Sequence, residues 1–87
     1  MFGGAGVYRD GVMFALIAGE ALYFKADELT TAEFEAEGLT PFIYATKNGT
    51  NTIMSYWRAP DRCLDDPHEM VEWAAKALAA ALRARKP

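Results

Sequence analysis

The stretch MFGGAGVYRDGVMFALIAGEALYFKAD, residues 1–27, decides the fold of this chain of 87 residues. Three runs within it are typical of short strands: residues 2–9, Val12–Ala18 and Ala21–Lys25. Asp10-Gly11 separates the first two runs, and both residue types tolerate the positive φ angles of a type I′ hairpin turn. Gly19-Glu20 separates the second run from the third. The stretch therefore predicts an antiparallel meander of three strands, which the rest of the chain covers.

A short helix is predicted within residues 27–38, with Thr30 or Thr31 as its N-cap and Gly38 just beyond its end. The residues that share one face at helical spacing are Leu29, Ala32 and Ala36, with Phe34 flanking them. Two turns are too few for an independent helix, so we expect packing on the sheet to hold it.

A second hairpin follows the short helix. Pro41 opens a run at residues 41–47, and Asn48-Gly49 predicts another type I′ turn into a run at residues 51–57. Two hairpins of similar turn chemistry, one on either side of a short helix, predict one antiparallel sheet of five strands.

A long helix is predicted at the end of the chain, after a single helical turn at Asp61–Leu64. Asp66 is expected as its N-cap and Pro67 as its first residue, while Glu69 can complete a capping box. The helix is expected to run to about Arg85. Its apolar stripe is Met70, Trp73, Ala74, Ala77, Leu78, Ala81 and Leu82. At about 28 Å it is long enough to cross the whole sheet.

The predicted fold class is therefore α+β, with two layers. A five-stranded antiparallel sheet, made of the meander and the second hairpin around the short helix, carries the long C-terminal helix on one face. The chain is expected to form a single domain, residues 1–87, because it is short. Its apolar fraction of 52% and charged fraction of 24% are those of a globular protein. The core is thin, because a chain this short buries only about 60–65% of its unfolded surface.

Composition also limits the classes of function. Residues 1–72 hold five Lys/Arg against twelve Asp/Glu, and residues 73–87 hold four Lys/Arg and no acid, which gives −7, +4 and a net charge of −3. An acidic body repels phosphate backbones, so direct nucleic-acid binding is not expected. One cysteine cannot form an internal disulfide, and no apolar run approaches the ~20 residues that span a bilayer. A cytoplasmic location without membrane contact is expected.

Several residues suggest chemistry that their surroundings do not support. Gly3-Gly4-Ala5-Gly6 could cradle a phosphate, but a strand and a hairpin follow where a helix is needed. Cys63 and the single histidine, His68, are the most specific candidate for a catalytic pair. The aspartates around Cys63 would, however, raise the pKa of its thiol. We expect no catalytic residue, no metal ligand and no cofactor.

Aromatic side chains are the remaining candidate surface. Tyr56-Trp57 on the last predicted strand, together with Tyr8, Tyr23 and Tyr44, could stack single-stranded bases, but few Lys or Arg lie among them. Core or oligomer packing is the favoured interpretation. A possible interaction surface is predicted at Phe2, Tyr8, Tyr56 and Trp57.

Four blocks of the sequence taken in order, MFGGAGVYRDGVMFALIAGEALYFKAD, FEAEGLTPFIY, MSYWRAP and DDPHEMVEWAAKAL, resemble the N-terminal domain family of TfoX/Sxy, regulators associated with natural competence. The residues that match the family motif are Met1, Phe2, Gly3, Gly4, Tyr8, Asp10 and Gly11. The resemblance implies an α+β domain without catalytic residues. Family members usually carry a helix before the Met-Phe-Gly-Gly motif and a second helical domain. Both are expected to be missing here, which leaves a stand-alone N-terminal module.

The resemblance and the residues together predict a non-catalytic regulatory module that acts by protein–protein contact. The alternative is a small ligand-binding or thiol-dependent enzyme domain that uses Cys63 or an aromatic pocket. A protein partner and a homodimer are also expected, because the run Val12–Ala18 is apolar on both faces in a chain with only two helices to cover it. Its predicted faces are Met13, Ala15 and Ile17 opposite Phe14 and Leu16.

Overall fold

The computed structural model describes residues 4–85, with the side chains of residues 44–46 excepted. Five strands form one antiparallel sheet in the order β1-β2-β3-β5-β4. They are β1 (Ala5–Arg9), β2 (Val12–Ala18), β3 (Ala21–Lys25), β4 (Pro41–Thr46) and β5 (Gly49–Arg58). The meander and the second hairpin are therefore joined by pairing β3 with β5, and the predicted α+β class is confirmed. The first three residues of the family motif, Met1, Phe2 and Gly3, lie outside the described residues.

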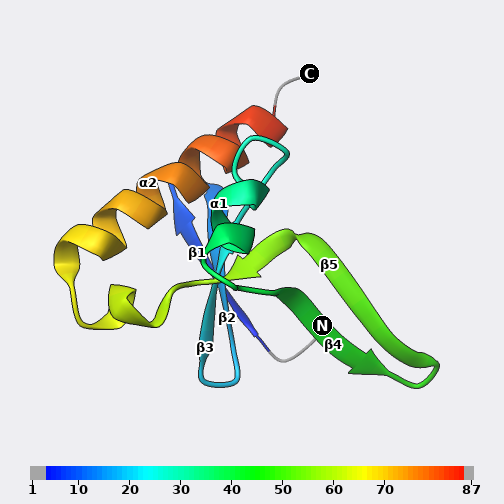
Figure 1. Cartoon of the computed structure of the whole chain (residues 1–87). Helices are drawn as coiled ribbons and strands as arrows, with labels where there is room; N and C mark the ends of the chain where they lie inside the picture. Colours follow the sequence, from blue (N-terminus) through cyan, green and yellow to red (C-terminus); the bar gives the residue numbers. More distant parts are fainter. Residues whose placement is uncertain (1–3, 86–87) are drawn as a thin grey trace.

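Three helical elements complete the chain: α1 (Thr31–Ala36), the 3₁₀ turn η1 (Asp61–Leu64) and α2 (Pro67–Ala84). The long helix α2 packs on β2 and β3, and the short helix α1 packs on β5. Figure 1 shows the hairpin of β4 and β5 extending away from the helices. No helix in the part of the chain that the structure describes is long and apolar enough to cross a membrane.

The two hairpin turns differ, although the sequence predicts type I′ chemistry for both. Asp10 and Gly11 both take positive φ angles, 51° and 79°, as the first turn requires. In the second hairpin, Thr46 pairs with Gly49, so the loop is Lys47-Asn48 rather than Asn48-Gly49. Gly49 alone takes the positive φ, 122°, and opens β5. The second turn is therefore displaced by one residue, and its positive φ angle falls on a glycine, which has no Cβ to oppose it.

The pairing of β1 with β2 contains a β-bulge. Val7 lies opposite Ala15 and Tyr8 lies opposite Met13, so the ladder skips Phe14. A bulge redirects the side chain of the extra residue. Phe14 and Ala15 consequently both pack toward the core under α2. The strict alternation of faces predicted along this strand is therefore wrong.

The core lies between the helices and the sheet and is built on aromatic rings. The ring of Phe34 from α1 lies 5.0 Å from that of Trp73 on α2 and 6.1 Å from that of Trp57 on β5, measured between centroids. Phe24 and Ala15 supply the floor of this cluster from the sheet. Large aromatic groups give a thin core most of its buried apolar area.

The face of α1 that enters this core is not the predicted one. Phe34 is 1% exposed, whereas Leu29 is 66% exposed and Ala32 and Ala36 lie at the surface. Leu29 precedes the helix, in a turn where its backbone N–H donates to the carboxylate of Asp27 at 3.0 Å. The prediction treated Leu29 as helical, and the larger aromatic side chain takes the buried position instead.

The start of α2 agrees only in part with the prediction. Asp66 is the N-cap, and its carboxylate accepts from the backbone N–H groups of His68 at 2.9 Å and Glu69 at 3.4 Å. The reciprocal half of the predicted capping box is absent, because the backbone N–H of Asp66 donates to the carbonyl of Arg62 at 2.9 Å. Glu69 is thereby free to serve a different contact.

Candidate functional site

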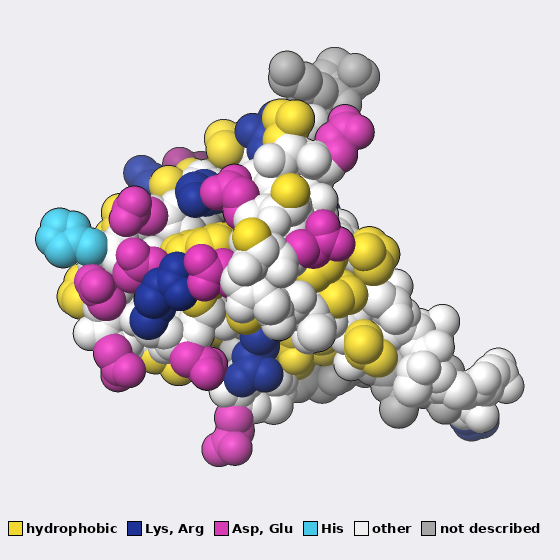
Figure 2. All heavy atoms as spheres, in the orientation of Figure 1, with side chains coloured by type: hydrophobic (Ala, Val, Ile, Leu, Met, Phe, Trp, Pro, Cys, Tyr) yellow, Lys and Arg dark blue, Asp and Glu magenta, His cyan; other side chains and the backbone are white. Residues whose placement is uncertain are grey.

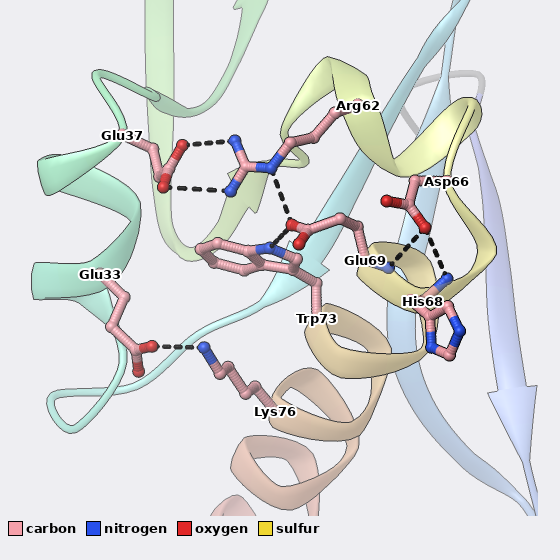
Figure 3. A network of polar contacts seen from close by, with 8 residues as sticks. All are labelled: Glu33, Glu37, Arg62, Asp66, His68, Glu69, Trp73 and Lys76. Carbon is pink, nitrogen blue, oxygen red and sulfur yellow. Dashed lines mark hydrogen bonds and ion pairs between the residues drawn. The ribbon is translucent and has the colours of Figure 1, made fainter.

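The guanidinium of Arg62 on η1 joins two carboxylates from different parts of the chain (Figure 3). It donates to both carboxylate oxygens of Glu37, at 2.7 and 3.1 Å, and to Oε1 of Glu69 at 2.7 Å. The same Oε1 accepts from the indole Nε1 of Trp73 at 3.2 Å. Arg62 holds the pKa of Glu37 below its ordinary value, and the two carboxylates raise the pKa of Arg62. Charge-assisted pairs of this geometry fix η1 against α2 and the end of α1.

Two further ion pairs join α2 to the segment around α1. Lys76 Nζ lies 2.5 Å from Glu33 Oε1 and 4.7 Å from the centroid of the Trp73 ring. Arg83 donates to both oxygens of Asp27, at 2.6 and 3.0 Å, and the pKa of Asp27 is lowered chiefly by that contact. Figure 2 shows acidic and basic side chains interleaved over η1, α1 and the N-terminal half of α2. These ion pairs therefore hold this flank of α2 against η1 and the segment around α1, so the flank is covered within the chain.

These charged groups do not form a reactive constellation. Each carboxylate of the network pairs with a cation or an indole N–H, which leaves it structural rather than available as a base. Among residues 4–85, no group of three or more His, Cys, Asp or Glu side chains is placed to hold a metal ion.

The structure also separates the candidate enzymatic pair. Cys63 is buried in the aromatic core, and burial raises the pKa of its thiol, with a further contribution from the carboxylate of Glu69. His68 is exposed at the second position of α2, and Figure 3 shows its imidazole pointing away from the Arg62 network. A buried thiol with a raised pKa is a poor nucleophile at neutral pH.

The structure describes three of the four residues of the predicted interaction surface, and these three occupy different environments. Trp57 is buried in the core and does not belong to a surface. Tyr8 is 62% exposed, and Phe2 lies outside the described residues. Tyr56 is half-buried beside Lys25, whose Nζ lies 5.1 Å from the ring centroid. Burial raises the pKa of Tyr56, and nearby Tyr8 adds to that shift.

Tyr23 does not extend this surface. Tyr23 is half-buried and meets Phe42 edge to face at 4.8 Å between centroids. The side chain of Tyr44 lies outside the described residues. The tyrosines of β3 and β5 therefore pack across the sheet face opposite α2, and only Tyr8 stands out as an exposed ring among those described.

A second surface, which the sequence analysis missed, lies along the open flank of α2. An apolar groove of about 390 Å³ runs between this helix and the sheet. The residues that line it are Arg9, Phe14, Val71, Ala74, Ala75, Leu78, Ala79 and Leu82. Val71 is 67% exposed and Leu82 is 50% exposed, although both are large aliphatic side chains. Phe14 and Ala74 also line an adjoining apolar hollow of about 530 Å³ beside β2 and β3, so the two form a continuous surface.

The groove explains why the predicted stripe of α2 is only partly correct. Its buried residues are Trp73, Ala77, Ala80 and Ala81, while Leu82 belongs to the exposed side. The apolar residues of α2 fall on two faces, and the alanine-rich sequence hides the boundary between them. A helix apolar on more than one face is normally buried on more than one face, and this signal was available in the sequence.

Comparison with known proteins adds one finding. The family model of the TfoX N-terminal domain matches residues 1–81, which include the whole sheet and most of α2. No curated protein matches the chain with significance.

Proposed function

The chain belongs to the TfoX N-terminal domain family, and from this premise we propose that it is a regulatory module that acts by protein–protein contact without catalysing a reaction. The observation that carries the proposal is the groove along α2. There two large aliphatic side chains, Val71 and Leu82, are exposed beside Phe14, which is partly buried against the core.

The energetics of the groove favour a protein ligand. Burying an exposed aliphatic side chain such as Val71 or Leu82 is worth about 1–2 kcal/mol, since each still exposes half or more of its surface. Arg9 is the one charged residue that lines the groove, so few polar groups would lose water on binding. An apolar patch rimmed by polar residues is typical of a protein contact site.

The main alternative is a thiol-dependent or ligand-binding domain that uses Cys63. It is disfavoured because the thiol is buried and its pKa is raised. Nucleic-acid binding is disfavoured by the net charge of −3 and by the carboxylates that cover the flank shown in Figure 2. A cytoplasmic location stays a prediction.

Site-specific photo-crosslinking in the native host tests the proposal. A photoreactive amino acid replaces Val71 in the groove or, in the matched control, Leu29, which is equally exposed at 66% but lies outside the groove. We expect a discrete crosslinked protein band from position 71 and none from position 29. Absence of a specific band at position 71, or equal bands at both positions, would contradict protein contact through this groove.

A further inference from the structure

The flank of α2 beside the groove carries a regular apolar stripe. This outer stripe consists of Val71, Ala74, Ala75, Leu78, Ala79 and Leu82, and all six residues line the groove. Their spacing is i, i+3, i+4, i+7, i+8 and i+11, the pattern of a helix that packs along another helix. The stripe is therefore a helix-packing surface without a helix on it within the described structure.

We propose that the groove is occupied by α2 of a second copy of this chain, with the two helices antiparallel across a two-fold axis. This inference rests on the proposed function, because it names the partner of the same contact site. Three properties of the described residues support it: the symmetry of the outer stripe, the distribution of charge along α2, and the closure of the opposite flank.

The outer stripe is symmetric about the midpoint between Lys76 and Ala77. Reversing the helix about that point exchanges the members of three pairs: Val71 with Leu82, Ala74 with Ala79, and Ala75 with Leu78. An isologous two-fold interface requires that the same surface meets itself in reverse. Each large residue of the stripe then meets a partner position that holds an apolar residue, and the alanines allow the helices to approach closely.

The charge along α2 favours the antiparallel direction. Its N-terminal end carries Asp65, Asp66, Glu69 and Glu72, and its C-terminal end carries Arg83 and Arg85. In an antiparallel pair each acidic end lies beside the basic end of the other copy. The two helix macrodipoles then point in opposite directions, which is the favourable arrangement. A parallel pair would place like charges together. Several of these charges already pair within the chain, so they set the direction of the contact more than its strength.

The flank of α2 opposite the groove is not available to a partner. Lys76 and Arg83 hold it to the segment around α1 through Glu33 and Asp27. A second copy can therefore reach α2 only from the side of β1 and β2, where Phe14 forms part of the floor. The β-bulge that turns Phe14 toward α2 is thus part of the proposed interface.

Cysteine pairing tests this geometry directly. Cys63 is first replaced by Ala, and then V71C and L82C are made as separate single variants. Mild oxidation of a mixture of the two is expected to give a disulfide-linked dimer, because position 71 of one copy lies beside position 82 of the other. Each variant alone is expected to stay uncrosslinked, since equal positions lie at opposite ends of the pair, about 16 Å apart at 1.5 Å per residue.

Two outcomes would overturn the proposal. One is the absence of a crosslinked dimer in the mixture, and the other is crosslinking of a single variant as efficient as that of the mixture. A mixture of L82C with L29C, whose second cysteine lies outside the groove, is the matched control and is expected to stay uncrosslinked. If the V71C and L82C mixture fails while position 71 photo-crosslinks to a different protein in the host, the second copy is wrong but protein contact stands. If both experiments fail, the proposed function is wrong as well.

Discussion

At the scale of single residues, the fold depends on a few side chains that tie distant segments together. Arg62 joins Glu37 and Glu69, which are 25 and 7 residues away in the chain, and Phe34 contacts tryptophans from β5 and α2. Neither contact follows from local sequence, because each depends on where the sheet places η1 and α1. The sequence analysis placed Phe34 only beside the predicted face of the short helix and did not single out Arg62.

Phe34 is expected to be the most sensitive of these positions. F34A should lower the free energy of unfolding by about 3–5 kcal/mol, because it removes a fully buried ring between two tryptophans. L29A, two residues before α1, should cost little because Leu29 is exposed. Urea denaturation followed by tryptophan fluorescence measures both. A large loss in L29A with a small loss in F34A would contradict the packing of Phe34 between the two tryptophans.

Asp27 is expected to make stability depend on pH. Its carboxyl pKa is lowered below 3.8 in the folded protein, mainly by Arg83, so the ionised form is favoured by folding. The stabilisation is therefore present above pH 3.8 and is lost as pH falls through the folded pKa. D27N should be less stable than the wild type by about 1 kcal/mol at neutral pH, because a partly exposed pair contributes little more.

Urea denaturation at a series of pH values checks this expectation. The difference between the wild type and D27N should shrink as the solution becomes acidic. D61N is the control. Asp61 is almost fully exposed, and its contact with Arg58, at 4.0 Å, is too long and too exposed to add much stability. A difference that stays constant with pH would show that the pair with Arg83 does not form.

At the scale of elements, the sheet and two of the local signals follow the prediction, whereas the second turn is displaced and the β-bulge at Phe14 was not predicted. Asp10-Gly11 and the start of α2 at Asp66-Pro67 follow from residues next to each other, and both are confirmed. The bulge at Phe14 depends on how β1 pairs with β2, and no local pattern reports that pairing. The groove was missed for a related reason: alanine is compatible with either face of α2, so periodicity could not divide the inner stripe from the outer one.

The N-cap of α2 offers a test at this scale. D66A should lower the free energy of unfolding by about 1 kcal/mol, because the carboxylate accepts from two backbone N–H groups at the helix start. D65A, one residue earlier and exposed, is the control. Equal effects in the two variants, measured by thermal or urea denaturation, would contradict the assignment of Asp66 as the cap.

At the scale of the whole molecule, the two flanks of α2 differ in whether the rest of the chain covers them. One flank is closed by ion pairs to α1 and η1, and the other presents the outer stripe above Phe14. Covering such a stripe adds most to the stability of a small domain with a thin core, because the apolar area buried in the contact adds to the modest area buried on folding. The homodimer expected from the sequence on other grounds, the two apolar faces of β2, is here proposed through α2 instead.

L82E tests that account at the level of assembly. Leu82 is half exposed, so a charge there should leave the monomer folded, as far-ultraviolet circular dichroism would show. Within the proposed dimer it would place a carboxylate in an apolar interface, and dissociation is expected. L29E is the control at an exposed leucine outside the groove.

Sedimentation equilibrium at high micromolar concentration is the most direct test of the central claim, that the groove along α2 is a protein contact site filled by a second copy. The account predicts a dimer for the wild type and for L29E, and a folded monomer for L82E. A wild-type chain that sediments as a monomer, or an L82E chain that remains a dimer, would contradict it.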